Sequence, residues 1–162
     1  MAEDTAITQG SPATRNANFG MAWVALCLAF VAHVIDEAST HFLSVYNPTV
    51  TALRQGFSWF PVPTLQFGDW LTGLIVVNAI LLLLSPFAFR DARWLRPIAY
   101  VFAVIMLLNS LGHTLGTIVG GTVESVRFPR PMPGFYSSPL LLAASIYLLW
   151  QLKASGRIVR AQ

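Results

Sequence analysis

Two short polar motifs hold all three histidines of this chain, and both lie inside apolar runs long enough to cross a lipid bilayer. HVIDEASTH covers residues 33–41, and NSLGH covers residues 109–113. An ionisable side chain in hydrocarbon costs at least about 2.5–3.5 kcal/mol on insertion scales, so a span carrying His33, Asp36 and Glu37 needs polar partners from other helices. The two motifs are therefore where we expect the helices to meet and function to reside.

The composition places the chain among integral membrane proteins. Of its 162 residues, 55% are hydrophobic and 10% are charged, and the mean hydropathy is +0.60. This is too apolar for an ordinary soluble domain, and the length suits one compact unit. Four apolar runs approach the roughly 20 residues that cross about 30 Å of hydrocarbon: residues 19–43, 68–89, 97–119 and 138–152. The sequence predicts an all-α, integral membrane four-helix bundle over residues 19–155.

The ends of the chain differ from these runs. Residues 1–18 are polar and rich in small side chains, which predicts a disordered N-terminal segment. No basic stretch opens directly onto the first apolar run, and the acids Asp36 and Glu37 within it are not typical of a cleaved signal peptide. The first run is therefore expected to remain as a helix, and residues 156–162 are expected to form a tail.

The basic residues predict the orientation in the membrane. If four spans alternate, seven of the ten basic residues lie on the side of the termini (Arg15, Arg90, Arg93, Arg96, Lys153, Arg157 and Arg160) and three on the other (Arg54, Arg127 and Arg130). The positive-inside rule then places both termini in the cytoplasm, at the inner (plasma) membrane. The arginines form no stripe with aromatic residues, which argues against a nucleic-acid partner.

The two segments expected on the outer side, residues 44–67 and 120–137, are unusually aromatic. Such side chains suit a belt at the membrane interface. Asn47-Pro48 followed by TALRQG predicts a capped helical turn or two ending at Gly56. We expect a partly interfacial helix and a proline-rich flap that together form a lid. Aromatic anchoring alone is the alternative.

Helical geometry places the polar residues of the first motif on one stripe. At about 100° per residue, five side chains fall within an arc of about 140°: His33, Asp36, Glu37, Thr40 and His41. In the third run, Asn109 and His113 are four residues apart and share a face. A rise of about 1.5 Å per residue puts Glu37 and His113 at one depth, and His33 and Asn109 nearer the midplane. The sequence predicts a two-layered site in the outer half of the bundle.

The second run carries two further polar residues. Asp69, at its outer start, could approach the upper layer, although an acid in the first turn of a helix is the more ordinary role. Asn78 lies about opposite Asp69 on the helical wheel and could face a neighbouring helix or another subunit. A homo-oligomer is therefore compatible with the sequence.

These motifs resemble those of a known family. The pattern His33-x-x-Asp36-Glu37, the later Asn109-x-x-x-His113, and Pro133-Gly134-x-x-Ser137 before the last run look like the HXXEE-motif family of small bacterial membrane proteins. The resemblance covers about three of the four runs. Asp36 stands where the family's first glutamate would be, which keeps the charge but shortens the reach. The resemblance implies the membrane fold and the choice of site, and it supplies no reaction.

Two chemical interpretations of the site compete. In the first, His33, Glu37 and His113, with Asp36 or His41 as an additional ligand, bind a divalent metal such as zinc or iron, and an open position activates water or oxygen. In the second, Glu37 and His113 act without metal as an acid and base pair on a lipid or hydrophobic small molecule. The catalytic candidates are thus Glu37, His113 and Asp36, supported by Asn109, Thr40 and Asp69.

Two non-enzymatic alternatives remain. The polar cluster could hold the helices together by hydrogen bonds, or it could form a proton or ion pathway. Against a pathway, no ionisable group lies in the cytoplasmic half of any run. No Gly-rich phosphate loop and no serine nucleophile elbow is present in the sequence.

Overall fold

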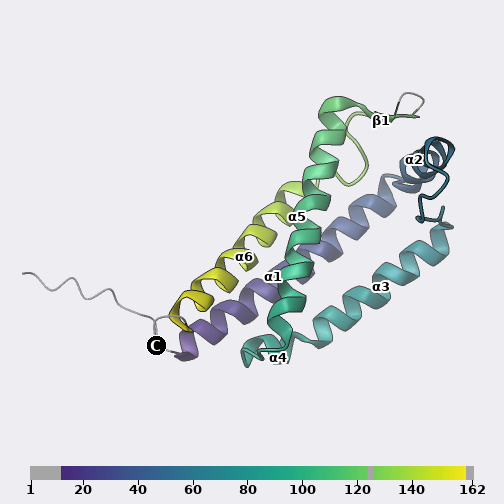
Figure 1. The fold of residues 1–162 in the computed structure, drawn as a ribbon. Coiled ribbons are helices and arrows are strands. Elements are labelled where there is room, and N and C mark those ends of the chain that lie inside the picture. The colour runs from purple at the N-terminus through teal and green to yellow at the C-terminus, as the bar shows by residue number, and fades with distance from the viewer. Residues whose placement is uncertain (1–11, 124–125, 160–162) are drawn as a thin grey trace, which may run out of the picture.

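The computed structural model describes residues 12–123 and 126–159, and helices dominate it (Figure 1). The elements in chain order are α1 (Pro12–Ser39), α2 (Leu43–Gly56), α3 (Phe67–Leu83), α4 (Ser85–Phe89), α5 (Leu95–Val119), β1 (Gly121–Val123), β2 (Val126–Arg127) and α6 (Ser138–Val159). The two strands pair antiparallel as a small hairpin. This hairpin is a departure from the predicted all-α class, and it follows the left-handed turn at Gly120, where φ is +76°.

Three helical segments in the described residues are long and apolar enough to cross a membrane. They are Ala17–Ser39, Phe67–Phe89 and Leu95–Val119, each with a mean hydropathy of at least 1.7 in its most apolar window. They match the first three predicted spans and suggest a membrane location. α6 is a long helix, but the part of it that the structure describes is not among these three segments. The fourth span, and with it the four-helix membrane bundle, stays a prediction.

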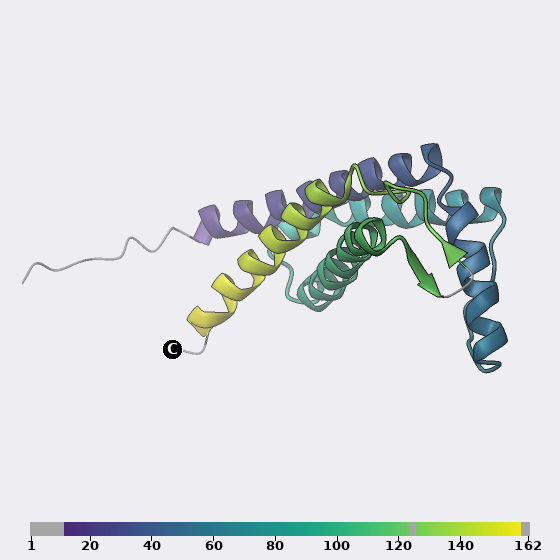
Figure 2. The same cartoon turned by 90° about the horizontal axis from the view of Figure 1, so that it is seen from above.

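The helices do not surround one common axis. α6 packs along both α1 and α5, whereas α3 lies against α1 on a different side (Figures 1 and 2). The apolar core is centred on α1, where Trp23 and Leu26 are fully buried, and it continues to Phe102 on α5 and Leu141 on α6. The Trp23 indole N–H also donates to the carbonyl of Leu81, 3.0 Å away on α3. α1 is therefore the central helix of the fold.

The start of α1, the short helix α4 and the end of α6 gather at one end of the molecule, and α2 and the hairpin gather at the other (Figure 1). Arg96, at the α4 end, forms a bidentate pair with Asp91, with its shortest bond at 2.8 Å. Arg54 and Arg127 belong to α2 and β2, at the opposite end. These three arginines therefore lie at opposite ends of the molecule. Which end faces the cytoplasm stays a prediction.

Both predicted terminal segments differ in part from the observed structure. α1 begins at Pro12, so residues 12–18 are helical although the sequence predicted disorder there. Proline is tolerated in the first helical turn because the N–H it lacks would have no partner in the helix. α6 continues to Val159, so residues 156–159 of the predicted tail are helical as well. Residues 1–11 and 160–162 of the predicted terminal segments lie outside the described residues.

α2 turns away from the axis of α1 and lies across one end of the molecule (Figure 2). It ends at Gly56 as predicted, but it begins at Leu43, so Asn47 lies within the helix instead of capping it. The Asn47 side chain binds the following loop, donating from Nδ2 to the carbonyl of Leu65 and accepting from its N–H, both at 2.9 Å. The buried Val45 packs with Val126 and Phe128. α2 and the hairpin region therefore form one outer layer.

Candidate metal centre

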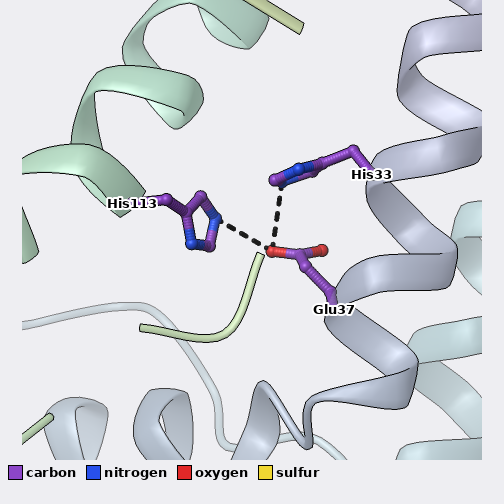
Figure 3. A group of neighbouring side chains, drawn as sticks. All are labelled: His33, Glu37 and His113. Atoms are coloured by element: carbon purple, nitrogen blue, oxygen red, sulfur yellow. Dashed lines mark ion pairs between the residues drawn. The ribbon is translucent and has the colours of Figure 1, made fainter. Parts of the chain in front are cut away.

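Three buried side chains converge between α1 and α5 (Figure 3). Glu37 Oε1 lies 3.1 Å from His113 Nε2 and 3.5 Å from His33 Nε2. One ligand atom from each residue lies within 4.8 Å of the others. The three residues are 0% (His33), 4% (Glu37) and 2% (His113) exposed, so water contributes little to their solvation. This trio is a group of potential metal ligands enclosed by protein.

The local sequence explains this convergence. His33 and Glu37 are four residues apart on α1, so they lie on one face of that helix. Asn109 and His113 have the same spacing on α5, and Asn109 Nδ2 lies 3.1 Å from His33 Nε2. The two histidine rings meet edge to face, with centroids 4.8 Å apart. Each helix therefore contributes one i, i+4 pair, as the sequence predicted.

A hydrogen-bonded chain on the far side of His33 orients its ring. The N–H and the hydroxyl of Ser137 both donate to Asp36 Oδ2 at 2.8 Å, and Ser137 Oγ lies 2.8 Å from His33 Nδ1. A serine hydroxyl has one proton, so once Asp36 accepts it, Nδ1 must be the donor to Ser137. A neutral His33 then carries its proton on Nδ1. Its Nε2 is then unprotonated and lies 3.1 Å from Asn109 Nδ2 and 3.5 Å from Glu37 Oε1.

The loop before α6 covers the cluster at Gly134. This residue has a φ of +84°, and a Cβ built on it would lie 2.7 Å from His113 Cε1 and 3.1 Å from Glu37 Cγ. Thr40 Oγ1 donates to the carbonyl of Asp36 at 2.6 Å and accepts from the Gly134 N–H at 3.3 Å. Only glycine combines this backbone conformation with so close an approach. The polypeptide backbone itself therefore forms part of the roof.

His113 leaves one polar atom without a partner. Its Nε2 faces Glu37, whereas its buried Nδ1 has no hydrogen-bond partner among the described residues. The ring centroid of Phe42 lies 5.6 Å away on one side. Phe42 lies in the predicted first span and not in the outer aromatic segments, so the aromatic lid stays a prediction.

The structure brings together most of the predicted site residues. His33, Glu37 and His113 form the cluster, Asn109 contacts His33, and Asp36 reaches it through Ser137. The predicted pairs are present, since His33 lies beside Asn109 and Glu37 lies beside His113, and the depth of the two pairs in a membrane stays a prediction. Thr40 connects the end of α1 to the roof.

His41 and Asp69 are not brought to the cluster. α1 ends at Ser39, and His41 follows in a left-handed conformation with a φ of +58°. The helical wheel therefore no longer applies to it, and its side chain is exposed. Asp69 is exposed in the first turn of α3, where an acid interacts favourably with the helix dipole. Asp36 is likewise not a member of the trio, because its carboxylate is engaged by Ser137.

Sequence reasoning missed two residues that shape the site. Ser137 connects Asp36 to His33, and Gly134 closes over His113 and Glu37. Both lie in the Pro133-Gly134-x-x-Ser137 motif, just before the predicted last span. The position of this motif directly before a predicted span could have indicated that it lies near the site. The contact partners, about a hundred residues earlier in the chain, were not visible from local pattern.

The chain was compared with protein families, with curated proteins and with solved structures. The resemblance to the HXXEE-motif family stays a prediction. Neither a family model, nor a curated protein, nor a solved structure matches this chain.

Proposed function

We propose that this protein is a membrane-embedded enzyme that uses a divalent metal, zinc or iron, to act on a lipid or a hydrophobic small molecule. His33, Glu37 and His113 would be the ligands, through Nε2, Oε1 and Nε2. Two imidazoles and one carboxylate are a donor set used for catalytic zinc and for non-haem iron(II). The proposed setting is the outer part of the inner membrane, with both termini cytoplasmic.

The observation that carries the proposal is the convergence of three potential ligand atoms, each within 4.8 Å of the others, in a buried space. A neutral His33 protonated on Nδ1 has an acceptor Nε2 that lies 3.5 Å from Glu37 Oε1, and a carboxylate is itself only an acceptor. A cation bound between them would stabilise both acceptors, in place of the Asn109 Nδ2 donor that lies 3.1 Å from His33 Nε2. Ligands about 2.05 Å from a tetrahedral ion lie about 3.3 Å apart. The separations of 3.1 and 3.5 Å around Glu37 Oε1 lie on either side of that value.

Other residues of the chain would orient the ligands and restrict water around them. A bound zinc or iron ion would activate water or oxygen at a position that the three ligands leave open. Asp36 and Ser137 orient the His33 ring, and Asn109 donates to His33 Nε2 when no ion occupies it. Gly134 and Phe42 restrict water around His113.

A metal-free acid and base pair is the second candidate. The observation that favours it is the 3.1 Å separation between Glu37 Oε1 and His113 Nε2, which is a hydrogen-bond distance without any ion. In this mechanism His113 donates a proton from Nε2 and Glu37 receives one. A proton pathway or a purely structural cluster would use the same contacts.

Metal analysis of the detergent-purified protein separates these candidates. After reconstitution with Zn²⁺ or Fe²⁺ and removal of the excess, we expect about one ion per chain, and loss of the ion in His113→Ala. His41→Ala is the matched control, because it removes an exposed imidazole outside the cluster. We expect it to retain the ion.

The outcome that would contradict the metal proposal is a wild-type protein with no stoichiometric ion. Proton flux into liposomes that Glu37→Gln abolishes would favour the pathway instead. If Glu37→Gln, His33→Ala and His113→Ala change only the thermal stability, the cluster is structural. The enzymatic part is tested by incubating the loaded protein with a membrane lipid extract and looking for products that Glu37→Gln does not form.

A further inference from the structure

A second buried polar feature lies on the other side of α1. Asn78, on α3, is 6% exposed, and its Oδ1 has no hydrogen-bond partner among the described residues. It is the central residue of the apolar segment Phe67–Phe89. An unsatisfied amide at that depth costs up to several kcal/mol, because no water is available in the hydrocarbon core. A partner for this amide is therefore expected.

Asn78 lines a groove of about 470 Å³ between α1 and α3. The other lining residues are almost all apolar, with Val34, Ile35 and Ala38 on α1 and Ile75 and Ala79 on α3. The volume lies within the range of about 300–1,000 Å³ typical of small-molecule sites, and a mostly apolar wall with one well-placed polar group is their usual chemistry.

The groove is separate from the His33, Glu37 and His113 cluster. On α1, Val34 and Ala38 lie about 100° around the helix from His33 and Glu37, and Ile35 lies farther round. The cluster faces α5, whereas the groove faces α3. A ligand in the groove therefore does not require a metal ion at the cluster.

We infer that this groove binds one molecule of an uncharged lipidic alcohol, with its chain along the apolar wall and its hydroxyl on the Asn78 amide. Oδ1 is an acceptor and requires a donor from the ligand, and a hydroxyl both donates to Oδ1 and accepts from Nδ2. An ether or ketone leaves Oδ1 unsatisfied. An ammonium group would bring a charge to the membrane midplane without an acidic residue in the lining. Phospholipid headgroups remain at the interface, too far from the midplane to reach Asn78.

The test compares 1-hexadecanol with its methyl ether, which cannot donate, in equilibrium binding to the purified full-length protein in detergent. We expect about tenfold tighter binding of the alcohol, since the ether leaves a buried acceptor unpaired. In Asn78→Leu the two probes should bind equally well. Ala79→Phe, which adds bulk inside the groove, should weaken both. Ile80→Phe is the matched control, because Ile80 is 52% exposed on the same helix and outside the lining, and it should change neither.

Three outcomes would overturn the inference. The first is the absence of saturable binding of 1-hexadecanol to the wild-type protein. The second is an alcohol preference that survives in Asn78→Leu. The third is a dimer that Asn78→Leu converts to monomer, because the amide would then pair with its copy in a second chain. Metal content is unaffected in each case, so failure here leaves the proposed metal site untouched.

Discussion

The cluster between α1 and α5 and the groove between α1 and α3 each place polar side chains inside apolar helices, but they satisfy them differently. Around His33, Ser137 lies 2.8 Å from Nδ1 and Asn109 lies 3.1 Å from Nε2. Ser137 in turn donates to Asp36 at 2.8 Å. In the groove, the Oδ1 atom of Asn78 has no partner among the described residues, and within the cluster the same is true only of His113 Nδ1. Burial alone therefore does not mark a functional residue. The polar atoms of a buried residue that lack a partner, or that converge on one point, indicate which ligand the residue can bind.

The largest expected effect comes from closing the space above the cluster. Gly134→Val adds a branched side chain at a φ of +84°, where the first added carbon would meet His113 and Glu37. We expect a loss of about 4 kcal/mol of stability, from backbone strain and overpacking together, and loss of the bound metal. SDS titration in mixed micelles measures the first and elemental analysis the second. Gly112→Ala is the control, because a Cβ there meets nothing within 4 Å, and it should be nearly neutral.

The second largest loss of stability is expected from removing Glu37 Oε1, which lies near both histidines. Glu37→Leu removes the atom that lies 3.1 Å from His113 and 3.5 Å from His33. We expect about 2–3 kcal/mol of destabilisation, because hydrogen bonds to charged groups are the stronger ones and the imidazoles stay buried. The same titration measures it. An unchanged stability would mean that Glu37 is not bonded to the histidines in the membrane.

The hydrogen bonds that link Asp36, Ser137 and His33 should contribute less to stability than Glu37 does, and their loss can also be observed by NMR. Ser137→Ala removes the hydroxyl that joins Asp36 to His33 Nδ1, while the backbone N–H of residue 137 still donates to Asp36. The lost hydroxyl contacts should cost about 1–2 kcal/mol. A double-mutant cycle with Asp36→Asn should show coupling of at least about 0.5 kcal/mol. In Ser137→Ala, ¹⁵N NMR should show that the signal of the His33 Nδ1 proton disappears or broadens by exchange. Ser39→Ala, an exposed serine bonded only to its own helix, is the control.

The smallest effect compares the same substitution in the two regions. Asn109→Leu removes the donor to His33 and should destabilise the protein by about 1 kcal/mol. Asn78→Leu removes an unsatisfied amide and should stabilise the protein by about 1 kcal/mol or more when no lipidic alcohol is present. Unfolding titrations in alcohol-free detergent measure both. Two losses of equal size would remove the contrast between the regions.

The local part of the site was predictable because helical periodicity acts over four residues. It placed His33 with Glu37 and Asn109 with His113, and matching depth predicted that the two pairs meet. The same periodicity failed at His41, because α1 ends at Ser39 and no strong stop signal precedes that histidine. It also could not find Ser137, whose contacts with Asp36 and His33 span more than a hundred residues of chain.

The sequence by itself determined the apolar helices and the polar stripes they carry, since hydropathy and the 3.6-residue period are properties of consecutive residues. Tertiary structure alone decided which polar groups find partners. It brought the loop at Gly134 against His113, joined Asp36 to His33 through Ser137, and left Asn78 facing an apolar groove. The physical reason is that a hydrogen bond depends on positions within about 3 Å, and such positions between distant segments are fixed only when whole helices pack.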